Sequence, residues 1–382
     1  FTRQILDDPS LDGVAAVLFD EFHERSLDAD AGLAFALDAQ RALRPDLRLL
    51  VMSATLEGAR VAALLGDAPV IESAGRAYPV ETRYLGRDPR ARIEDQMTDA
   101  IVTALRAQAG SILAFLPGQG EIRRVAERLA ERVTDESVVI APLYGAMDMA
   151  AQDRAVRPAA PGTRKIVLAT AIAETSLTIE GVRVVIDSGL ARVPRYEPGA
   201  GITRLVTQRV TRAAADQRRG RAGRLEPGVC YRLWSEPETQ SLRPFAEPEI
   251  RSSDLSGLLL DCAEWGATDP ATLAWLDPPP PAPLDAARAE LIRLGALDGE
   301  ARITPLGRRL RALPLPPRLA RMVISAADFD SAREAADIAA VLVERGLGGN
   351  DVDLVHRLEA FRRDRTRRAE DKRRLAANWA RK

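Results

Sequence analysis

Residues 14–25 read Val14-Ala-Ala-Val-Leu-Phe-Asp-Glu-Phe-His-Glu-Arg25, so that an apolar run passes directly into a charged one. A short continuous apolar run of this kind is typical of a strand buried on both faces of a parallel sheet. Asp20 and Glu21 then stand at the carboxyl end of that strand, where open α/β sheets bind their ligands. The stretch therefore predicts an α/β fold with two carboxylates at its ligand-binding edge.

The same pattern continues along the chain. Further strand-like runs cover residues 48–52, 111–116, 138–142, 165–170 and 182–187. Helical stretches separate these runs, and strands alternating with helices indicate parallel βαβ units. A short helix is expected between Leu56 and Leu65. After Trp234 the strand signals largely stop, and helical patterns take over.

This organisation predicts four segments. Residues 1–75 form part of a first α/β lobe, and residues 76–236 form a second one. Residues 237–313 are expected to form a small helical domain of the winged-helix type, and residues 314–382 to begin a helical bundle. The tail from Phe361 to Lys382 is rich in basic residues, and it is either a solvated helix face or a basic surface.

Composition bounds the class of protein. The chain has 382 residues, 46% of them hydrophobic, which is enough for a sizeable core and for more than one domain. A formal net charge of −1 excludes a global polycation, so any basic site must be local. With only two cysteines and two histidines, a disulfide framework and a Cys/His zinc cluster are excluded. No membrane span or targeting segment is evident, and we expect a cytoplasmic protein.

The acidic pair suggests phosphate chemistry. In phosphate-cleaving ATPases an acidic residue at a strand end holds Mg²⁺, and a neighbouring group orients the attacking water. Asp20 would hold the metal and Glu21 the water. On its own, the pair could equally be the solvated start of a helix. Ser53-Ala-Thr55 follows the next strand, although Ser and Thr in such places often only cap a helix.

Residues 217–224 read Gln217-Arg-Arg-Gly-Arg-Ala-Gly-Arg224. Six arginines lie between Arg209 and Arg224, with only Asp216 to oppose them. Arginines three residues apart share a helix face, so Arg218, Arg221 and Arg224 are expected to converge on a polyphosphate. The alternative is a surface helix held by salt bridges.

No Gly-Lys pair occurs anywhere in the chain, so the phosphate-binding loop G-x-x-x-x-G-K-[ST] is absent. The chain also begins with Phe1 rather than methionine. We therefore expect a fragment that starts inside its first lobe and that is inactive alone.

Five stretches in order resemble the DEAH-box superfamily 2 helicases, with the closest likeness to the bacterial HrpB type. They are residues 20–25, 53–55, Phe115-Leu-Pro-Gly118, Ala169-Thr-Ala-Ile-Ala-Glu-Thr-Ser-Leu-Thr178 and 217–224. Phe22, residues 189–198 and residues 201–205 point to the HrpB branch. The resemblance implies tandem RecA-like lobes, the first one truncated, followed by winged-helix and ratchet-like helical segments. Leu276-Asp-Pro-Pro-Pro280 matches the winged-helix segment.

The resemblance also implies roles for individual residues. Asp20 and Glu21 match the metal-binding carboxylates. The nucleotide-binding positions are Asp20, Glu21, His23, Asp187, Gln217, Arg221 and Arg224, of which Glu21, Gln217, Arg221 and Arg224 are catalytic. The positions that couple the nucleotide site to the nucleic-acid site are His23, Ser53 and Thr55. Those that bind nucleic acid are Thr2, Arg3, Gly118 and Thr175. Residues 192–205 match a β-hairpin that helps to separate strands.

Two hypotheses from different classes follow. The first is an ATP-dependent nucleic-acid helicase, expected to act on RNA, with ATP and Mg²⁺ as cofactors and single-stranded or duplex nucleic acid as partner. The second is a regulatory module that binds nucleic acid without hydrolysis, as the missing phosphate loop would suggest. Glu21, Arg221 and Arg224 favour the first, because a chain that had abandoned hydrolysis would have little physical reason to keep them together.

Overall fold

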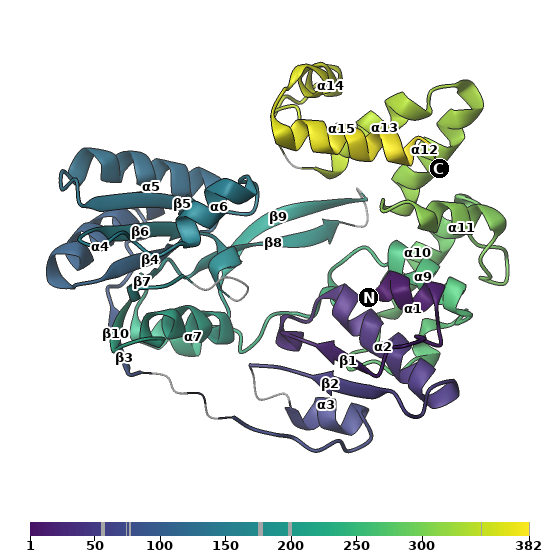
Figure 1. Cartoon of the computed structure of the whole chain (residues 1–382), viewed down its shortest axis with the longest axis horizontal. Helices are drawn as coiled ribbons and strands as arrows, with labels where there is room; N and C mark the ends of the chain where they lie inside the picture. The colour runs from purple at the N-terminus through teal and green to yellow at the C-terminus, as the bar shows by residue number, and fades with distance from the viewer. Residues whose placement is uncertain are drawn as a thin grey trace. The chain divides into compact units, whose positions relative to one another are not determined.

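The structure is a computed structural model that describes residues 1–54, 58–73, 75, 78–174, 179–197, 201–344 and 346–381. The chain forms two compact units (Figure 1). Unit 1 comprises Phe1–Val70, Tyr196–Thr203 and Glu247–Lys382, and unit 2 comprises Ile71–Arg195 and Arg204–Ala246. Each unit is described by itself.

Unit 2 is built on a six-stranded sheet in the order β3-β10-β7-β4-β6-β5, with every adjacent pair parallel. Its strands are β3 (Val80–Tyr84), β4 (Ser111–Phe115), β5 (Val138–Leu143), β6 (Arg164–Ala169), β7 (Val182–Asp187) and β10 (Gly228–Arg232). Every residue of β4 and β10 is buried, as the near-continuous apolar run of β4 predicts. The strands expected at 111–116, 138–142, 165–170 and 182–187 are confirmed, with ends shifted by at most one residue.

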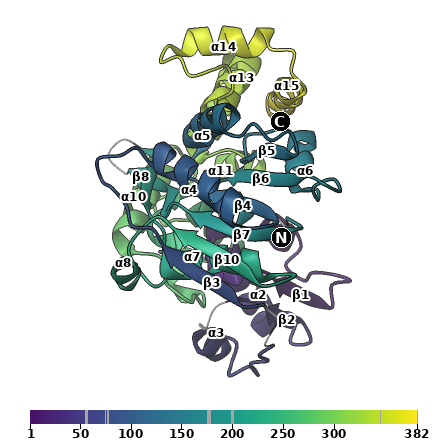
Figure 2. The same ribbon diagram turned by 90° about the vertical axis from the view of Figure 1, so that its left-hand side faces the viewer.

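Helices cover both faces of this sheet (Figure 2). Side chains of α4 (Ile93–Ala107) and α5 (Gln119–Arg132) share a core with Ile112, Ile166 and Val184 on one face. On the other face, α6 (Met149–Val156) and η3 (Arg221–Gly223) pack against Phe115 and Val185. The remaining helices of the unit are η2 (Ala171–Ala173), α7 (Arg212–Gly220) and α8 (Glu236–Gln240).

The amino-terminal part of unit 1 is also α/β. Strands β1 (Ala16–Phe19) and β2 (Arg48–Val51) pair in parallel, with Ala16 opposite Arg48. The predicted strands occur, although β1 begins two residues late because Val14 still closes a turn onto the Leu11 carbonyl. The expectation that this strand is buried on both faces is wrong, because exposed and buried residues alternate along β1 and Leu18 is exposed. The helices are α1 (Thr2–Asp7), α2 (Leu27–Ala42) and α3 (Gly58–Leu64), with the 3-10 turn η1 (Phe22–Glu24).

The rest of unit 1 is helical, as expected. Its elements are η4 (Glu249–Arg251), α9 (Ser256–Trp265), η5 (Pro270–Thr272), α10 (Pro281–Arg293), α11 (Pro305–Ala312), α12 (Pro317–Ala326), η6 (Ala327–Phe329), α13 (Ala332–Val343), α14 (Leu354–Arg363) and α15 (Arg367–Trp379). An antiparallel bridge between Leu297 and Ile303 lies between α10 and α11, in the manner of a small wing. One core runs from the buried alanines of α2 through these helices, so α2 and the helical part fold together.

Strands β8 (Leu190–Glu197) and β9 (Ile202–Arg209) form a separate two-stranded sheet, which confirms the predicted hairpin. Its tip belongs to unit 1, where the Tyr196 amide donates to the Ser252 carbonyl at 3.1 Å. Gly201, at φ +62°, lies against Arg318 of α12 so closely that a Cβ atom would fall 2.0 Å from a guanidinium nitrogen. The positive φ favours glycine at this position, whereas the flexible end of the Arg318 side chain can move to make space.

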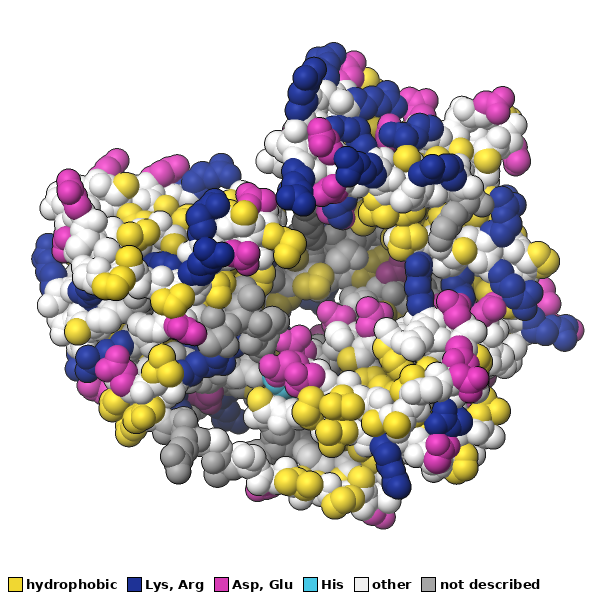
Figure 3. All heavy atoms as spheres, viewed as in Figure 1, with side chains coloured by type: hydrophobic (Ala, Val, Ile, Leu, Met, Phe, Trp, Pro, Cys, Tyr) yellow, Lys and Arg dark blue, Asp and Glu magenta, His cyan; other side chains and the backbone are white. Residues whose placement is uncertain are grey.

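Basic residues of the C-terminal helices are interspersed with acidic ones, as Figure 3 shows. Arg362 pairs with Glu334 and Asp337 of α13, and Arg363 pairs with Glu359 one turn earlier. In the last helix, α15, the residues Ala369, Ala376 and Trp379 are buried. The tail thus forms helices of the bundle, and ion pairs with acidic residues of the same bundle partly neutralise its basic side chains. In the part of the chain that the structure describes, no helix is both long and apolar enough to span a membrane.

Candidate nucleotide and nucleic-acid sites

The acidic pair of unit 1 lies in a strained turn at the end of β1. Asp20 is exposed, and one of its carboxylate oxygens accepts the Glu21 amide proton at 2.8 Å. Glu21 has left-handed backbone angles, φ 49° and ψ 35°, and its side chain is 42% exposed. Arg25, which ends the turn, is left-handed as well at φ 52°. A non-glycine residue in this conformation costs about 1 to 3 kcal/mol, so other contacts must hold the turn.

Two contacts join this turn to the segment after β2. The amide of buried Phe22 donates to the Met52 carbonyl at 3.0 Å. The ring nitrogen Nδ1 of His23 accepts the Ala54 amide proton at 3.2 Å, which places the proton of a neutral ring on Nε2. The same Nδ1 lies 3.5 Å from a Glu21 oxygen. The structure thus brings together Asp20, Glu21 and His23 beside exposed Ser53, while Thr55 lies outside the described residues.

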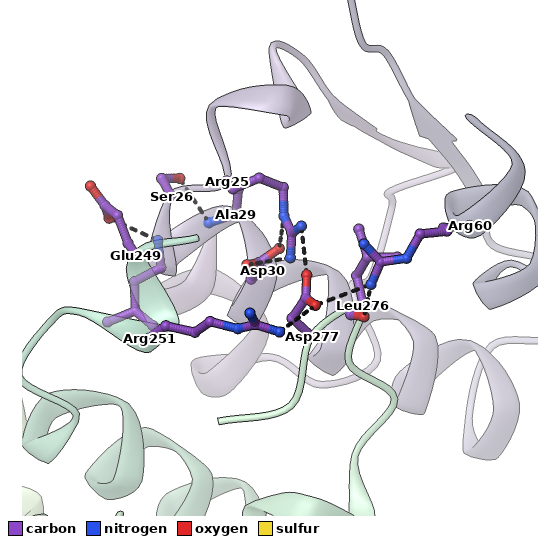
Figure 4. A network of polar contacts seen from close by, with 10 residues as sticks. Arg25, Ser26, Ala29, Asp30, Arg60, Glu249, Arg251, Leu276 and Asp277 are labelled. Carbon is purple, nitrogen blue, oxygen red and sulfur yellow. Dashed lines mark hydrogen bonds and ion pairs between the residues drawn. The ribbon is translucent and has the colours of Figure 1, made fainter. Parts of the chain in front are cut away.

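A second set of contacts holds the other end of the turn (Figure 4). The Arg25 guanidinium binds both oxygens of Asp30, each at 3.2 Å, and one oxygen of Asp277 at 2.7 Å. Arg60 and Arg251 donate to the other Asp277 oxygen at 3.1 and 3.0 Å. Burial opposes ionisation of Asp277, but the hydrogen bonds from Arg25 and Arg60 outweigh it and lower the pKa of that carboxyl. Both Arg25 and Asp277 lie in motifs that the sequence analysis named, but their contact was not predicted.

In unit 2 the central arginine of the predicted cluster is buried. Arg218 is 1% exposed and pairs with Asp187 at 2.8 Å and with Glu174 at 2.9 Å. Its guanidinium also lies over the Phe115 ring, 4.9 Å from the centroid. Burial alone would lower the pKa of Arg218, but the two carboxylates raise it. Asp187, predicted to bind nucleotide, is fully buried, and its oxygen Oδ2 has no hydrogen-bond partner among the described residues.

The expectation that Arg218, Arg221 and Arg224 share one helix face is wrong, because α7 ends at Gly220. Arg221 lies in the following turn η3, is 7% exposed and donates through Nε to the Glu174 backbone carbonyl at 2.9 Å. Arg218 and Arg221 thus meet at Glu174, whereas Arg224 lies beyond the turn and is exposed. Gln217 is half-buried on α7.

Two of the predicted nucleic-acid residues line a cavity of about 1040 Å³ in unit 1. Thr2 and Arg3 face it from α1, and Arg311 and Asp261 face it from α11 and α9. Arg311 pairs with Asp261 at 3.0 Å, but its nitrogen Nη2 is buried without a hydrogen-bond partner among the described residues. Burial raises the pKa of the Asp261 carboxyl, against the effect of Arg311. Sequence reasoning did not single out Arg311, because nothing near it in the chain marks it.

The other two nucleic-acid predictions fall in unit 2. Gly118 precedes α5 and is buried against Arg192 of β8, with a hypothetical Cβ only 2.3 Å from a guanidinium nitrogen. Arg192 in turn pairs with Glu121 at 2.9 Å. Thr175 lies outside the described residues.

Asp20 and Glu21 are the residues that would hold a metal ion. Within the described ranges no group of three or more His, Cys, Asp or Glu side chains is arranged to hold a metal ion. Asp20 and Glu21 nevertheless fit Mg²⁺, because Mg²⁺ is commonly held by one or two carboxylates, with water and substrate phosphates completing its shell. Both side chains are solvent-accessible, as such sharing requires.

Comparisons with known proteins agree with this architecture. Residues 95–226 match the helicase conserved C-terminal domain, and residues 287–315 match the winged-helix part of the helicase-associated domain. The chain is 51% identical over 349 residues to the ATP-dependent RNA helicase HrpB of Escherichia coli, and 38% identical over 350 residues to the pre-mRNA-splicing factor ATP-dependent RNA helicase prp22 of Schizosaccharomyces pombe. These matches cover 91% and 89% of this chain. They cover 43% and 30% of the two relatives, so the chain spans less than half the length of either.

The structural comparison extends over the whole chain. A crystal structure of the Escherichia coli DEAH/RHA helicase HrpB superposes with a TM-score of 0.90 at 47% identity, covering 100% of this chain and 48% of that one. The match confirms the predicted fold class, a RecA-like parallel sheet with flanking helices followed by winged-helix and helical segments. The chain belongs to the HrpB-type branch of the DEAH-box helicases.

Proposed function

We propose that this chain supplies the water-activating and arginine-bearing parts of an ATP-dependent RNA helicase. The observation that carries the proposal is the exposed Asp20–Glu21 pair, held in a strained turn and linked through His23 to the backbone at Ala54. In this proposal residues 1–75 and 76–236 are two RecA-like lobes, residues 237–313 the winged-helix domain and residues 314–382 the start of the helical bundle. The cysteine content supports a cytoplasmic location.

Asp20 and Glu21 would hold Mg²⁺ through their carboxylates. When bound with ATP, Mg²⁺ neutralises charge that develops on the phosphates. Glu21 would also orient and deprotonate the attacking water. The 42% exposure of the Glu21 side chain leaves room for that water. His23, Ser53 and Thr55 would carry the state of this site toward the nucleic acid.

In the second lobe, Arg221 and Arg224 would stabilise the transition state as arginine fingers, and Gln217 would meet the γ-phosphate side. Arg218 has a different role in this proposal, because its charge is already satisfied by Asp187 and Glu174. We infer that Asp187 contributes to the nucleotide site by fixing Arg218, and through it the backbone that carries Arg221. The shared contact at Glu174 supports this.

RNA would be held through its backbone. Thr2, Arg3, Gly118 and Thr175 are the proposed contacts, and the partly unsatisfied Arg311 adds a cation to the cavity beside Thr2 and Arg3. Hydroxyl, amide and guanidinium groups of this kind contact phosphate without reading base identity. The helicase activity named for the relatives supports RNA as the nucleic acid.

The test compares the 382-residue chain with the full-length gene product in a steady-state ATPase assay with and without single-stranded RNA. We expect RNA-stimulated hydrolysis from the full-length product and none from the chain, which contains no Gly-Lys pair to form a phosphate loop. Glu21→Gln in the full-length product should keep nucleotide binding and lose hydrolysis, because it removes a charge and little volume. RNA binding without hydrolysis by the full-length wild type would instead support the regulatory-module hypothesis.

A further inference from the structure

The acidic turn at the end of β1 is short and has few local means of holding its shape. Three residues of 3-10 helix, Phe22–Glu24, separate two left-handed residues, Glu21 and Arg25. Inside the turn, the Glu24 amide donates to the Glu21 carbonyl at 2.9 Å, and the Arg25 amide donates to the Phe22 carbonyl at 3.1 Å. Besides these two bonds and the contacts to Met52 and Ala54, the conformation of the turn depends on what fixes Arg25 at its end.

A distant stretch of chain, residues 249–277, fixes Arg25 at both its backbone and its side chain. The Glu249 amide donates to the Arg25 carbonyl at 3.1 Å, and the Glu249 carboxylate accepts the Leu27 amide proton at 2.9 Å. From the other end of this stretch, Asp277 binds the Arg25 guanidinium at 2.7 Å. In Figure 4 the Asp277 carboxylate lies among three guanidinium groups: Arg25 contacts one oxygen, and Arg60 and Arg251 reach the other from opposite sides.

These charges are shielded from water. The side chains of Arg25, Asp30 and Asp277 are 5%, 2% and 10% exposed. A charge-assisted hydrogen bond at low exposure is stronger and more directional than one in water. Asp30 lies only five residues from Arg25, so it would hold the guanidinium in any arrangement of the rest of the chain. Asp277 holds it only when the segment after α9 is in place.

We propose that Asp277 is a positioning residue for Glu21. Its carboxylate fixes Arg25, Arg25 fixes the end of the 3-10 turn, and the turn fixes the direction of Glu21 toward its water. Hydrolysis would then depend on the docking of the winged-helix segment as well as on the nucleotide. The inference rests on the proposed ATPase function, but its structural half can be tested without it.

Asp277→Asn is the discriminating variant. The amide oxygen still accepts from Arg60 and Arg251, while the amide –NH₂ then faces the Arg25 guanidinium, so that two donors meet. Asp30 remains to pair with Arg25, and no buried arginine is left alone. The fold should therefore survive while the Arg25 contact is lost.

The first measurement is amide hydrogen exchange in the 382-residue chain without nucleotide. Asp277→Asn should speed the exchange of the Phe22, Glu24 and Arg25 amides about tenfold or more, while the interior of α2 keeps its protection. Glu264→Gln, which removes an ion pair to Arg308 between α9 and α11, is the matched control and should leave the turn unchanged. Unchanged exchange of the turn in Asp277→Asn would overturn the proposal.

The second measurement is ATPase kinetics in the full-length gene product. Asp277→Asn should lower kcat about 10- to 100-fold with little change in KM for ATP, since misplacing a positioned group costs rate rather than binding. Asp277→Glu should recover part of the loss. A wild-type kcat in Asp277→Asn, despite faster exchange of the turn, would overturn the link to catalysis. If the wild type itself does not hydrolyse ATP, the proposed function fails, and the exchange experiment still decides the structural claim.

Discussion

Both α/β units carry carboxylates at the end of a strand, but the surroundings of these carboxylates differ. In unit 1 the acidic pair after β1 remains accessible, and the strain lies in the backbone of Glu21 and Arg25. In unit 2 Asp187, the last residue of β7, is fully buried, and its carboxylate pairs with Arg218, which is 1% exposed. One strand end is open to a ligand, while the other is closed by its own ion pair.

The difference distinguishes charged groups that are accessible to a ligand from charged groups that stabilise the fold. A buried arginine with two carboxylates within 3 Å has little left to offer a phosphate. Its neighbour Arg221 meets it at Glu174, whereas Arg224 lies beyond the turn and is exposed. Sequence spacing alone made the three arginines equivalent, and burial makes them unequal. The first two of the following experiments test that inequality, and the third tests whether the two units open separately.

The largest effect is expected at Arg221 and Arg224, the proposed arginine fingers. In the full-length gene product, Arg221→Ala and Arg224→Ala should each lower kcat by a factor on the order of 10³ to 10⁵, with a much smaller change in KM, because a finger acts on charge that develops in the transition state. Single-turnover and steady-state ATPase assays measure this. Small and equal losses at both positions would mean that the cluster is structural throughout.

The next effect is on stability rather than rate. Arg218→Met should lower the free energy of opening of unit 2 by about 3 to 5 kcal/mol, because it leaves buried Asp187 without its cation. Arg219→Met is the control, since the Arg219 side chain is 41% exposed and its nearest carboxylate, on Asp216, is 3.9 Å away. Urea-dependent labelling of Cys230, which is buried in β10, reports the opening. Equal stability of the two variants would count against a supporting role for Arg218.

The smallest effect compares matched helix caps. Ser26 caps α2 in unit 1 by accepting the Ala29 amide proton, and Thr211 caps α7 in unit 2 in the same way, each at 3.2 Å. Replacing either by alanine should cost about 1 kcal/mol. Ser26→Ala should then speed labelling of Cys262, and Thr211→Ala that of Cys230. Acceleration of both cysteines by each variant would show that the two units open together.

The cysteines suit this use because neither reacts without opening. Both are buried, and burial raises the pKa of Cys230 to about 12 and that of Cys262 higher still. Because the thiolate is the reactive form, native-state labelling near neutral pH should be slow at both sites.

Sequence patterns predicted the parts of the fold whose signal is local. All six expected strands occur, because a short apolar run bounded by polar residues buries its side chains most readily as a strand of a sheet. Strands β3 and β10 were missed. The sequence of β3, Val80-Glu-Thr-Arg-Tyr84, carries two charges that form an ion pair with each other on an edge strand, and β10 ends in Arg232. A charged strand resembles a loop until its partners are known.

The candidate site was predicted only in part. The acidic pair and its histidine could be found because they are contiguous with a strand. The partners of Arg25 and Arg218 could not, since Asp277 lies 252 residues away and Asp187 lies 31 residues away in the chain. An arginine can be buried only where the fold brings a carboxylate close to it. A local sequence pattern does not show which distant carboxylate that will be.

The hairpin has a consequence for how this chain can be divided. Because its tip belongs to unit 1 and its base to unit 2, the backbone passes between the units four times, near residues 70, 195, 203 and 246. A single proteolytic cut therefore releases neither unit whole. Separate expression would need two new linkers for unit 1, which has three segments, and one for unit 2, which has two. The two units pack as separate bodies, but the backbone joins them at four places.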